Sequence, residues 1–106
     1  MAMDETESSV LIDVWTVDPS REPELLDRIR DITRELIVDH EGFESAQIYE
    51  SVDRAAVMIR IAMRTVKDRQ ALTDSSEVHN ALRELRAIAQ SHARVFKLVE
   101  DFGETV

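Results

Sequence analysis

The sequence predicts an α+β fold of the ferredoxin-like class, in the order β-α-β-β-α-β, with one antiparallel sheet. Strand-like and helix-like segments follow one another in that order along the 106 residues. The two long helical segments are amphipathic, so each has an apolar face that must pack on a sheet. The first strand-like segment is largely apolar on both sides, which indicates that a second layer covers the face opposite the helices.

The first predicted strand covers residues 10–17, and its two sides carry Val10, Ile12 and Val14 against Leu11, Asp13 and Trp15. A turn follows at Asp18-Pro19-Ser20. The first long helix is predicted over residues 23–40, with Ser20 or Glu22 as its cap. Its apolar stripe is Leu25, Ile29, Ile32 and Leu36.

Gly42 is placed to end this helix, because glycine accepts the left-handed backbone of a C-terminal cap. Two strands are predicted over residues 43–52 and 55–64. Between them, Asp53-Arg54 indicates a hairpin.

Thr65 and Asp68 have the spacing of a capping box, which predicts a short helix. Ser76 is the expected cap of the second long helix, over residues 77–90. The last strand is predicted over residues 94–99.

Composition restricts the class of protein. The length predicts one domain, residues 9–106, after a disordered acidic tail, residues 1–8. A net charge of −9 argues against nucleic-acid and anionic-membrane partners, and no apolar run is long enough to span a bilayer. The chain has no cysteine, which excludes disulfides and cysteine-ligated zinc. We expect a cytoplasmic protein.

Few residues are candidates for chemistry. The histidines, His40, His79 and His92, lack metal-binding spacing, so no metal site is predicted. His79 falls in the first turn of the second long helix, where the helix dipole favours a neutral ring that accepts a proton; a plain surface histidine is the alternative.

Asp13 is a carboxylate among apolar strand residues, so it is exposed at an edge, paired with Arg60 or Arg64, or functional. Trp15 is a core or interface residue, or the aromatic wall of a pocket. Tyr49 is a packed strand residue, or a hydrogen-bond partner for a ligand oxygen.

No phosphate loop, nucleophile elbow or dinucleotide fingerprint occurs in the sequence. We therefore expect that an enzyme with this sequence works without a bound nucleotide cofactor, or uses one supplied in solution, and no cofactor is predicted.

Three segments of the chain follow the order and spacing of a known family: VLIDVWTVDPSREPELLDRI (10–29), IVDHEGFESAQIYES (37–51) and MIRIAMRTVKDRQALTDSSEVHNALREL (58–85). Over about residues 9–99, and by order and spacing more than by invariant residues, the chain resembles the antibiotic biosynthesis monooxygenase family. Glu41 stands where that family usually has proline.

This resemblance implies a dimeric α+β barrel, a homodimer whose two sheets face each other, with an apolar pocket between the sheet and the helices of each subunit. It also implies a cofactor-independent oxygenase acting on an aromatic, polyketide-like or quinol small molecule. In such a mechanism the protein orients a phenol and stabilises developing negative charge while the substrate activates oxygen.

The sequence departs from the family at its known polar positions. Where the family's oxygenases have Trp, Asn and Tyr, this chain has Met63, Ile59 and Arg69, and only a helix arginine carries over, as Arg83. The haem-degrading branch needs Trp and His where this chain has Leu72 and Leu82, which makes haem an unexpected cofactor.

We therefore take a different set of candidates. The expected catalytic residues are Asp13, His79 and Arg83, and the expected substrate-binding residues are Trp15, Tyr49, Arg60 and Met63. The alternative function is a non-oxygenase dimeric small-molecule binding protein, or a polyketide cyclase or isomerase on the same scaffold.

Overall fold

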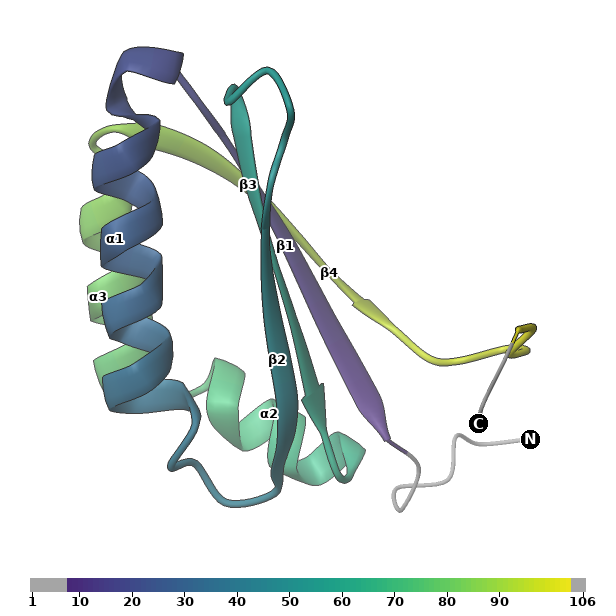
Figure 1. Cartoon of the computed structure of the whole chain (residues 1–106). Coiled ribbons are helices and arrows are strands. Elements are labelled where there is room, and N and C mark those ends of the chain that lie inside the picture. Colours follow the sequence, from purple (N-terminus) through teal and green to yellow (C-terminus); the bar gives the residue numbers. More distant parts are fainter. Residues whose placement is uncertain (1–7, 104–106) are drawn as a thin grey trace.

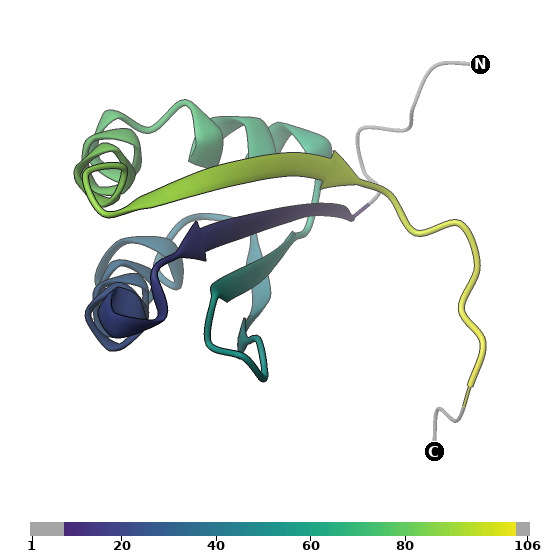
Figure 2. The same ribbon diagram turned by 90° about the horizontal axis from the view of Figure 1, so that it is seen from above.

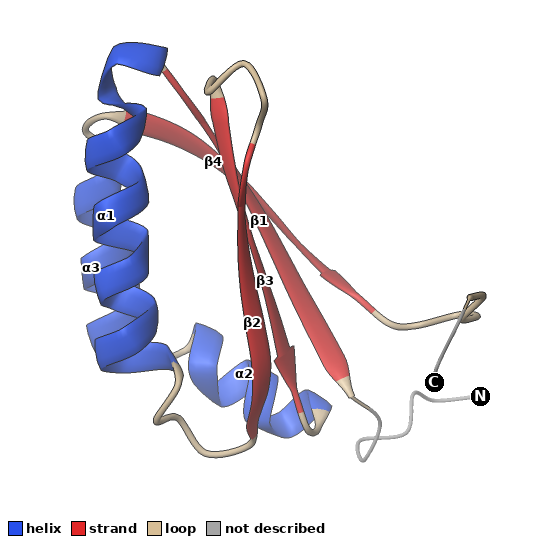
Figure 3. Ribbon diagram, viewed as in Figure 1, coloured by secondary structure: helices blue, strands red, loops and turns tan. Residues whose placement is uncertain are grey.

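Four antiparallel strands form one sheet with the order β2-β3-β1-β4, and the helices lie on one of its faces (Figure 1, Figure 3). The structure is a computed structural model that describes residues 8–103. Its elements run in the order β1 (Ser9–Val17), α1 (Glu22–Ile32), β2 (Phe43–Glu50), β3 (Ala56–Met63), α2 (Val66–Thr73), α3 (Ser76–Leu85) and β4 (Ala89–Phe96). This arrangement confirms the predicted fold class. The expected disordered tail lies outside the described residues, apart from Ser8.

β1 is a central strand that pairs with β3 on one side and β4 on the other (Figure 2). Asp13 lies opposite Ile59 of β3 and Ala93 of β4. Because paired residues share a sheet face, this row of side chains points toward the helices, as do Trp15 and its partners. The register therefore settles which face of the sheet Asp13 and Trp15 occupy.

No helix within residues 8–103 lies on the opposite face of the sheet, and we call it the open face (Figure 1). Its side chains come from the alternate positions of all four strands and are partly apolar. They include Val10, Ile12, Val14, Tyr49, Met58, Arg60 and Phe96.

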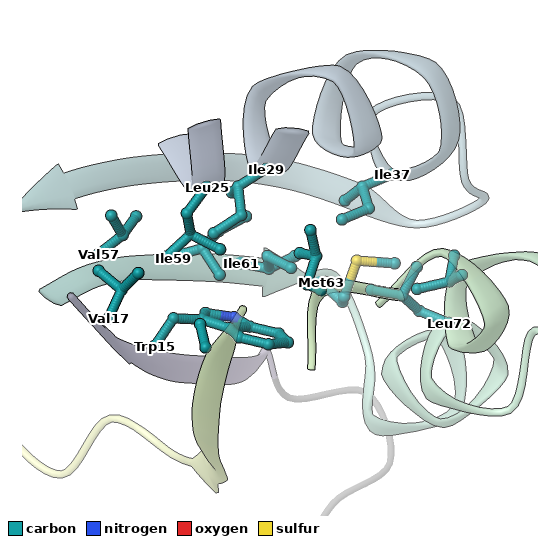
Figure 4. Packing of buried hydrophobic residues seen from close by; sticks show 13 residues of the cluster. Trp15, Val17, Leu25, Ile29, Ile37, Val57, Ile59, Ile61, Met63 and Leu72 are labelled. Carbon is teal, nitrogen blue, oxygen red and sulfur yellow. The ribbon is translucent and has the colours of Figure 1, made fainter. Parts of the chain in front are cut away.

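The hydrophobic core fills the space between the other sheet face and the helices (Figure 4). Leu25 and Ile29 from α1, Leu72 from α2 and Leu85 from α3 are each no more than 2% exposed. The amphipathic stripes that the sequence shows are thus the buried faces of these helices.

The entry of the chain into α1 differs from the prediction. Asp18, not Ser20 or Glu22, supplies the capping carboxylate, and it accepts a hydrogen bond of 2.9 Å from the backbone N–H of Ser20. A 3-10 turn at Pro19–Arg21 then leads directly into α1. The cap therefore stabilises this turn, and the N-cap residue of α1 itself has no side-chain cap.

The second long helix is shorter than predicted, and the last strand begins earlier. α3 ends at Leu85, and residues 89–96 form β4, whereas the sequence predicted helix to residue 90 and strand only from 94. Consequently His92 lies within a strand, not at a helix exit. Ser75, not Ser76, caps α3 by accepting from the N–H of Val78, at 3.4 Å.

The Thr65 cap and the hairpin agree with the prediction. Thr65 Oγ1 accepts from the N–H of Asp68 at 3.0 Å, at the start of α2. Within residues 8–103, no helix combines the length and the apolar character needed to cross a membrane.

Candidate functional site

A pocket of about 210 Å³ lies between the helix-covered sheet face and α1, α2 and α3. Most of its wall is aliphatic, from α1, the turn after it, β3 and α3. The polar side chains of the wall come from five separate segments and are Asp13, Thr33, Thr73, His79, Arg86 and Ser91. The pocket is therefore an apolar chamber with a few polar groups, which is the usual make-up of a small-molecule site.

Asp13 is the carboxyl group that the fold places in this pocket. It is 6% exposed, and its Oδ1 has no hydrogen-bond partner among the described residues. Burial raises its pKa from 3.8 to about 6, and the neighbouring Trp15, Arg86 and His92 each oppose that rise. At neutral pH the group is therefore close enough to its titration to gain or lose a proton readily.

Trp15 lines the pocket together with Asp13 and is fully buried. Figure 4 shows it among the residues of the hydrophobic core. Its indole Nε1 also has no hydrogen-bond partner among the described residues. The indole N–H lies near enough to Asp13 to favour the ionised carboxylate and so to lower its pKa. It does not form a hydrogen bond with Asp13 Oδ1. Each is therefore a buried polar atom whose hydrogen-bonding capacity is unused among the described residues.

α3 brings two cationic or titratable side chains to the pocket. His79 lines it from the first turn of the helix, although much of the ring is exposed, and Arg86 lines it from the C-cap. Arg83, the arginine that the resemblance selected, is exposed and is not part of the pocket wall. Its catalytic role stays a prediction.

Sequence reasoning missed four polar residues of the pocket wall, Thr33, Thr73, Arg86 and Ser91, of which Arg86 is the charged one. Val78, Leu82 and Arg86 follow at intervals of four, so the arginine ends the apolar stripe of this helix. An arginine in register with buried residues was the signal available in the sequence.

Two of the expected substrate-binding residues lie on the open face instead. Tyr49 pairs across the strands with Met58 and is 51% exposed. Arg60 Nη1 donates to Gln47 Oε1 at 2.9 Å on the same face. Neither residue lines the pocket of this chain. Their expected role in substrate binding stays a prediction.

The structure does not contain the ion pair of Asp13 with Arg60 or Arg64 that the sequence suggested as an explanation for a carboxylate among apolar residues. Arg60 lies on the other sheet face, and Arg64 is exposed and forms an ion pair with Asp68, at 3.7 Å. Asp13 therefore has neither arginine as a partner, because a strand directs alternate side chains to opposite faces.

Met63, the remaining expected substrate-binding residue, is fully buried in the core close to Leu72 (Figure 4). It is not part of the pocket wall. Its expected contact with substrate likewise stays a prediction.

The C-terminal end of the first helix widens into a π-turn, Thr33–Ile37, where the N–H of Val38 donates to the carbonyl of Thr33 at 3.0 Å. Thr33 and Ile37 both line the pocket. π-turns within helices occur frequently at functional sites. The apolar stripe of this helix is regular in the sequence and does not indicate the π-turn.

Within the described part of the chain, no group of three or more histidine, aspartate or glutamate side chains is arranged to hold a metal ion.

Comparisons with known proteins show the fold. No protein-family model and no curated protein matches the chain. Among solved structures, the monooxygenase ActVA-Orf6 of Streptomyces coelicolor, in complex with the ligand nanaomycin D, is 19% identical, with 96% of each chain covered and a TM-score of 0.79. SnoaB, a cofactor-independent oxygenase from Streptomyces nogalater, is 13% identical over 92% of this chain and 99% of its own, with a TM-score of 0.72.

A conserved protein from Methanosarcina mazei shares the fold as well, at 9% identity over 88% of this chain and 94% of its own, with a TM-score of 0.76. The chain therefore has the α+β fold of solved structures named as monooxygenases, some of them as putative antibiotic biosynthesis monooxygenases, and that part of the resemblance is confirmed. At these identities the likeness establishes the architecture, and activity must be argued from the site.

Proposed function

We propose that the protein is a member of the antibiotic biosynthesis monooxygenase family that oxidises a small phenol to a quinone with dioxygen and without a bound cofactor. The observation that carries this proposal is Asp13, a buried carboxyl with a free oxygen, in an apolar pocket of a fold shared with named monooxygenases. Cofactor-free oxidation of a phenol requires a group that takes the phenolic proton, and Asp13 is the carboxyl in the pocket wall.

In the proposed reaction, the ionised Asp13 takes the proton of the ring hydroxyl and so generates an electron-rich phenolate. The phenolate supplies the electrons that reduce dioxygen; the ring gains one oxygen atom and loses two hydrogen atoms, and the second oxygen leaves as water. Arg86 and the indole N–H of Trp15 stabilise the negative charge on the phenolate oxygen. The aliphatic wall holds the ring and excludes water, which strengthens these interactions.

The size of the pocket limits the substrate. A cavity of about 150 Å³ accommodates benzene, and the pocket here is about 210 Å³. The benzene-sized cavity and the pocket of this protein are both smaller than the range of about 300–1,000 Å³ that is typical of sites for drug-sized ligands. We therefore expect a compound of one or two fused rings in preference to a larger polyketide.

The test is oxygen uptake with α-naphthol, followed together with the absorbance of the naphthoquinone product and in the presence of a metal chelator. We expect stoichiometric uptake and a loss of at least about 100-fold in kcat for Asp13→Ala. The matched control is Asp27→Asn, an exposed carboxylate of α1 that is remote from the pocket wall. Unchanged turnover in Asp13→Ala would remove Asp13 from the reaction.

The same proposal includes a homodimer formed through the open face. Val14 and Ile12 lie at its centre on β1, and Phe96 at its edge is 45% exposed. A sheet with helices on one face only leaves such apolar surface to be buried by a second layer. Light scattering should give a dimer for the wild type and a folded monomer for Ile12→Asp. Val52→Asp, in the exposed hairpin, should remain dimeric.

A second candidate function is that of a binding protein, or of a cyclase or isomerase, on this scaffold. It is favoured by the absence of the family's polar groups, since Ile59 presents an aliphatic side chain to the pocket and Met63 belongs to the core. Tight binding of a naphthol without oxygen uptake would favour this second function.

A further inference from the structure

Two polar atoms of the pocket wall lack hydrogen-bond partners among residues 8–103, and both belong to β1. They are Oδ1 of Asp13 and Nε1 of Trp15. A buried polar group without a partner costs roughly 1–3 kcal/mol, and such groups in native proteins call for an explanation. A ligand oxygen in the pocket supplies one.

The two side chains share a strand, a sheet face and a pocket. They are two residues apart on one strand, which spans about 7 Å, and they point to the same sheet face and line the same pocket. The Trp15 N–H is a donor only, whereas the Asp13 carboxyl is an acceptor when ionised and also a donor when protonated.

We propose that Asp13 and Trp15 form a two-point site for a single ligand oxygen, which holds a ring hydroxyl when Asp13 is ionised and a ring carbonyl when Asp13 is protonated. A hydroxyl donates its proton to the Asp13 carboxylate while its oxygen accepts from Trp15. A carbonyl accepts from both groups, through its two lone pairs.

The charged and titratable groups around Asp13 allow both protonation states near neutral pH. Burial raises the pKa of Asp13 to about 6 against the opposing effects of Trp15, Arg86 and His92. α3 also contributes His79 to the pocket, whereas α1 with its π-turn and α2 contribute only neutral polar groups, Thr33 and Thr73. A change of pH across this range therefore exchanges one ligand class for the other.

This inference deepens the proposed function and rests on the same pocket. It names the ligands as flat hydroxy-aromatic and oxo-aromatic compounds of one or two rings. It also predicts which ligand stays bound above the pKa of Asp13. The ionised carboxylate retains the phenol substrate and releases the quinone product, so binding favours turnover from phenol to quinone.

The test is anaerobic calorimetric titration with α-naphthol and with menadione, a naphthoquinone, at pH 5 and pH 8. The chain has no cysteine that a quinone could alkylate. We expect menadione to bind about tenfold or more weakly at pH 8 than at pH 5, because the donor of Asp13 is lost two pH units above its pKa. α-Naphthol should show the opposite trend. Naphthalene, which has no oxygen, should bind equally at both pH values.

Three variants make the result specific. Asp13→Asn both donates and accepts at every pH, so the opposite trends should disappear. Trp15→Phe keeps an aromatic wall but loses the N–H, so both oxygen ligands should bind several-fold more weakly while naphthalene does not. His79→Gln should retain the opposite trends, which separates the titration of Asp13 from that of a histidine in the same pocket.

The outcomes separate this inference from the proposed oxidation. Opposite trends without oxygen uptake support the two-point site and contradict the oxygenase. Oxygen uptake with no difference in pH dependence between the two ligands contradicts the two-point site and leaves the oxygenase standing. Naphthalene has no oxygen to bind. If its affinity changed with pH as much as that of menadione, the two-point site would be overturned, because the pH would then be altering the shape of the pocket itself.

Discussion

The fully buried carboxylate of Glu22 is paired with Arg54, with 3.4 Å between Oε1 and Nη2. Glu22 begins α1, and Arg54 lies in the β2–β3 hairpin, where it has a left-handed φ of 63°. The Glu22 carboxylate also raises the pKa of the neighbouring Glu50. The contact therefore joins the helix layer to the hairpin through a charge that water does not reach.

Removing the arginine should destabilise the fold. We expect Arg54→Gln to lower the free energy of unfolding by about 1–2 kcal/mol, because it leaves the Glu22 charge buried without a cation. The effect stays below that of a fully buried pair because half of the Arg54 side chain is exposed. Urea denaturation measures it, and Arg34→Gln, which breaks an exposed pair with Asp31, should change the unfolding free energy by less than about 0.5 kcal/mol.

Gly42 should not tolerate a side chain. Its φ is +83°, and a Cβ there would collide with the side chain of Asp68 at the start of α2. Gly42→Ala is expected to lower the free energy of unfolding by about 1–3 kcal/mol, from backbone strain and from this collision. The double variant Gly42→Ala with Asp68→Ala should recover only part of the loss. Full recovery would mean that the backbone conformation costs nothing.

The elements predicted most closely from the sequence are those with strong local signals. The period-2 pattern of β1 and the capping box at Thr65 each describe interactions between near neighbours in the chain. The end of α3 could not be predicted in this way, since Ala87 and Ile88 continue a helical pattern. The helix stops because the residues of β4 gain a full ladder of hydrogen bonds along β1, and such tertiary pairing overrides local propensity.

The candidate site was predicted in part. The alternation of β1 correctly put Asp13 and Trp15 on one side, and the pocket contains both. For Tyr49 and Arg60 the register between strands could not be predicted from the sequence, and a register change of one residue exchanges the two sheet faces. The structure puts them on the open face, and only the pairing with β1 and β3 shows this.

Asp13 should lower stability at neutral pH. Its pKa is about 6 in the fold against an ordinary value of 3.8, so its favourable contribution is complete below pH 3.8 and is lost as the pH rises through 6. Asp13→Asn cannot ionise. We expect it to raise the free energy of unfolding by about 1–3 kcal/mol at pH 8, while it impairs the proposed oxidation.

Chemical denaturation of wild type and Asp13→Asn at pH 4, 6 and 8 measures this difference, which should grow with pH. The exposed variant Asp27→Asn should show no such growth. A constant difference between Asp13→Asn and wild type at all three values would show that Asp13 does not titrate in this range.

The two arginines near the end of α3 should differ in their effect on Asp13. Both arginines are exposed, but Arg86 also lines the pocket and its positive charge lowers the pKa of Asp13, whereas Arg83 lies outside the pocket wall. Arg86→Gln should therefore raise the pKa of Asp13 further and extend menadione binding to higher pH, with affinity at pH 8 improved about two- to fivefold. Arg83→Gln should leave the midpoint in place. Carbon NMR of the Asp13 carboxyl across pH 4–9 follows the titration directly, and an equal displacement in both variants would mean that the arginines act only through net charge.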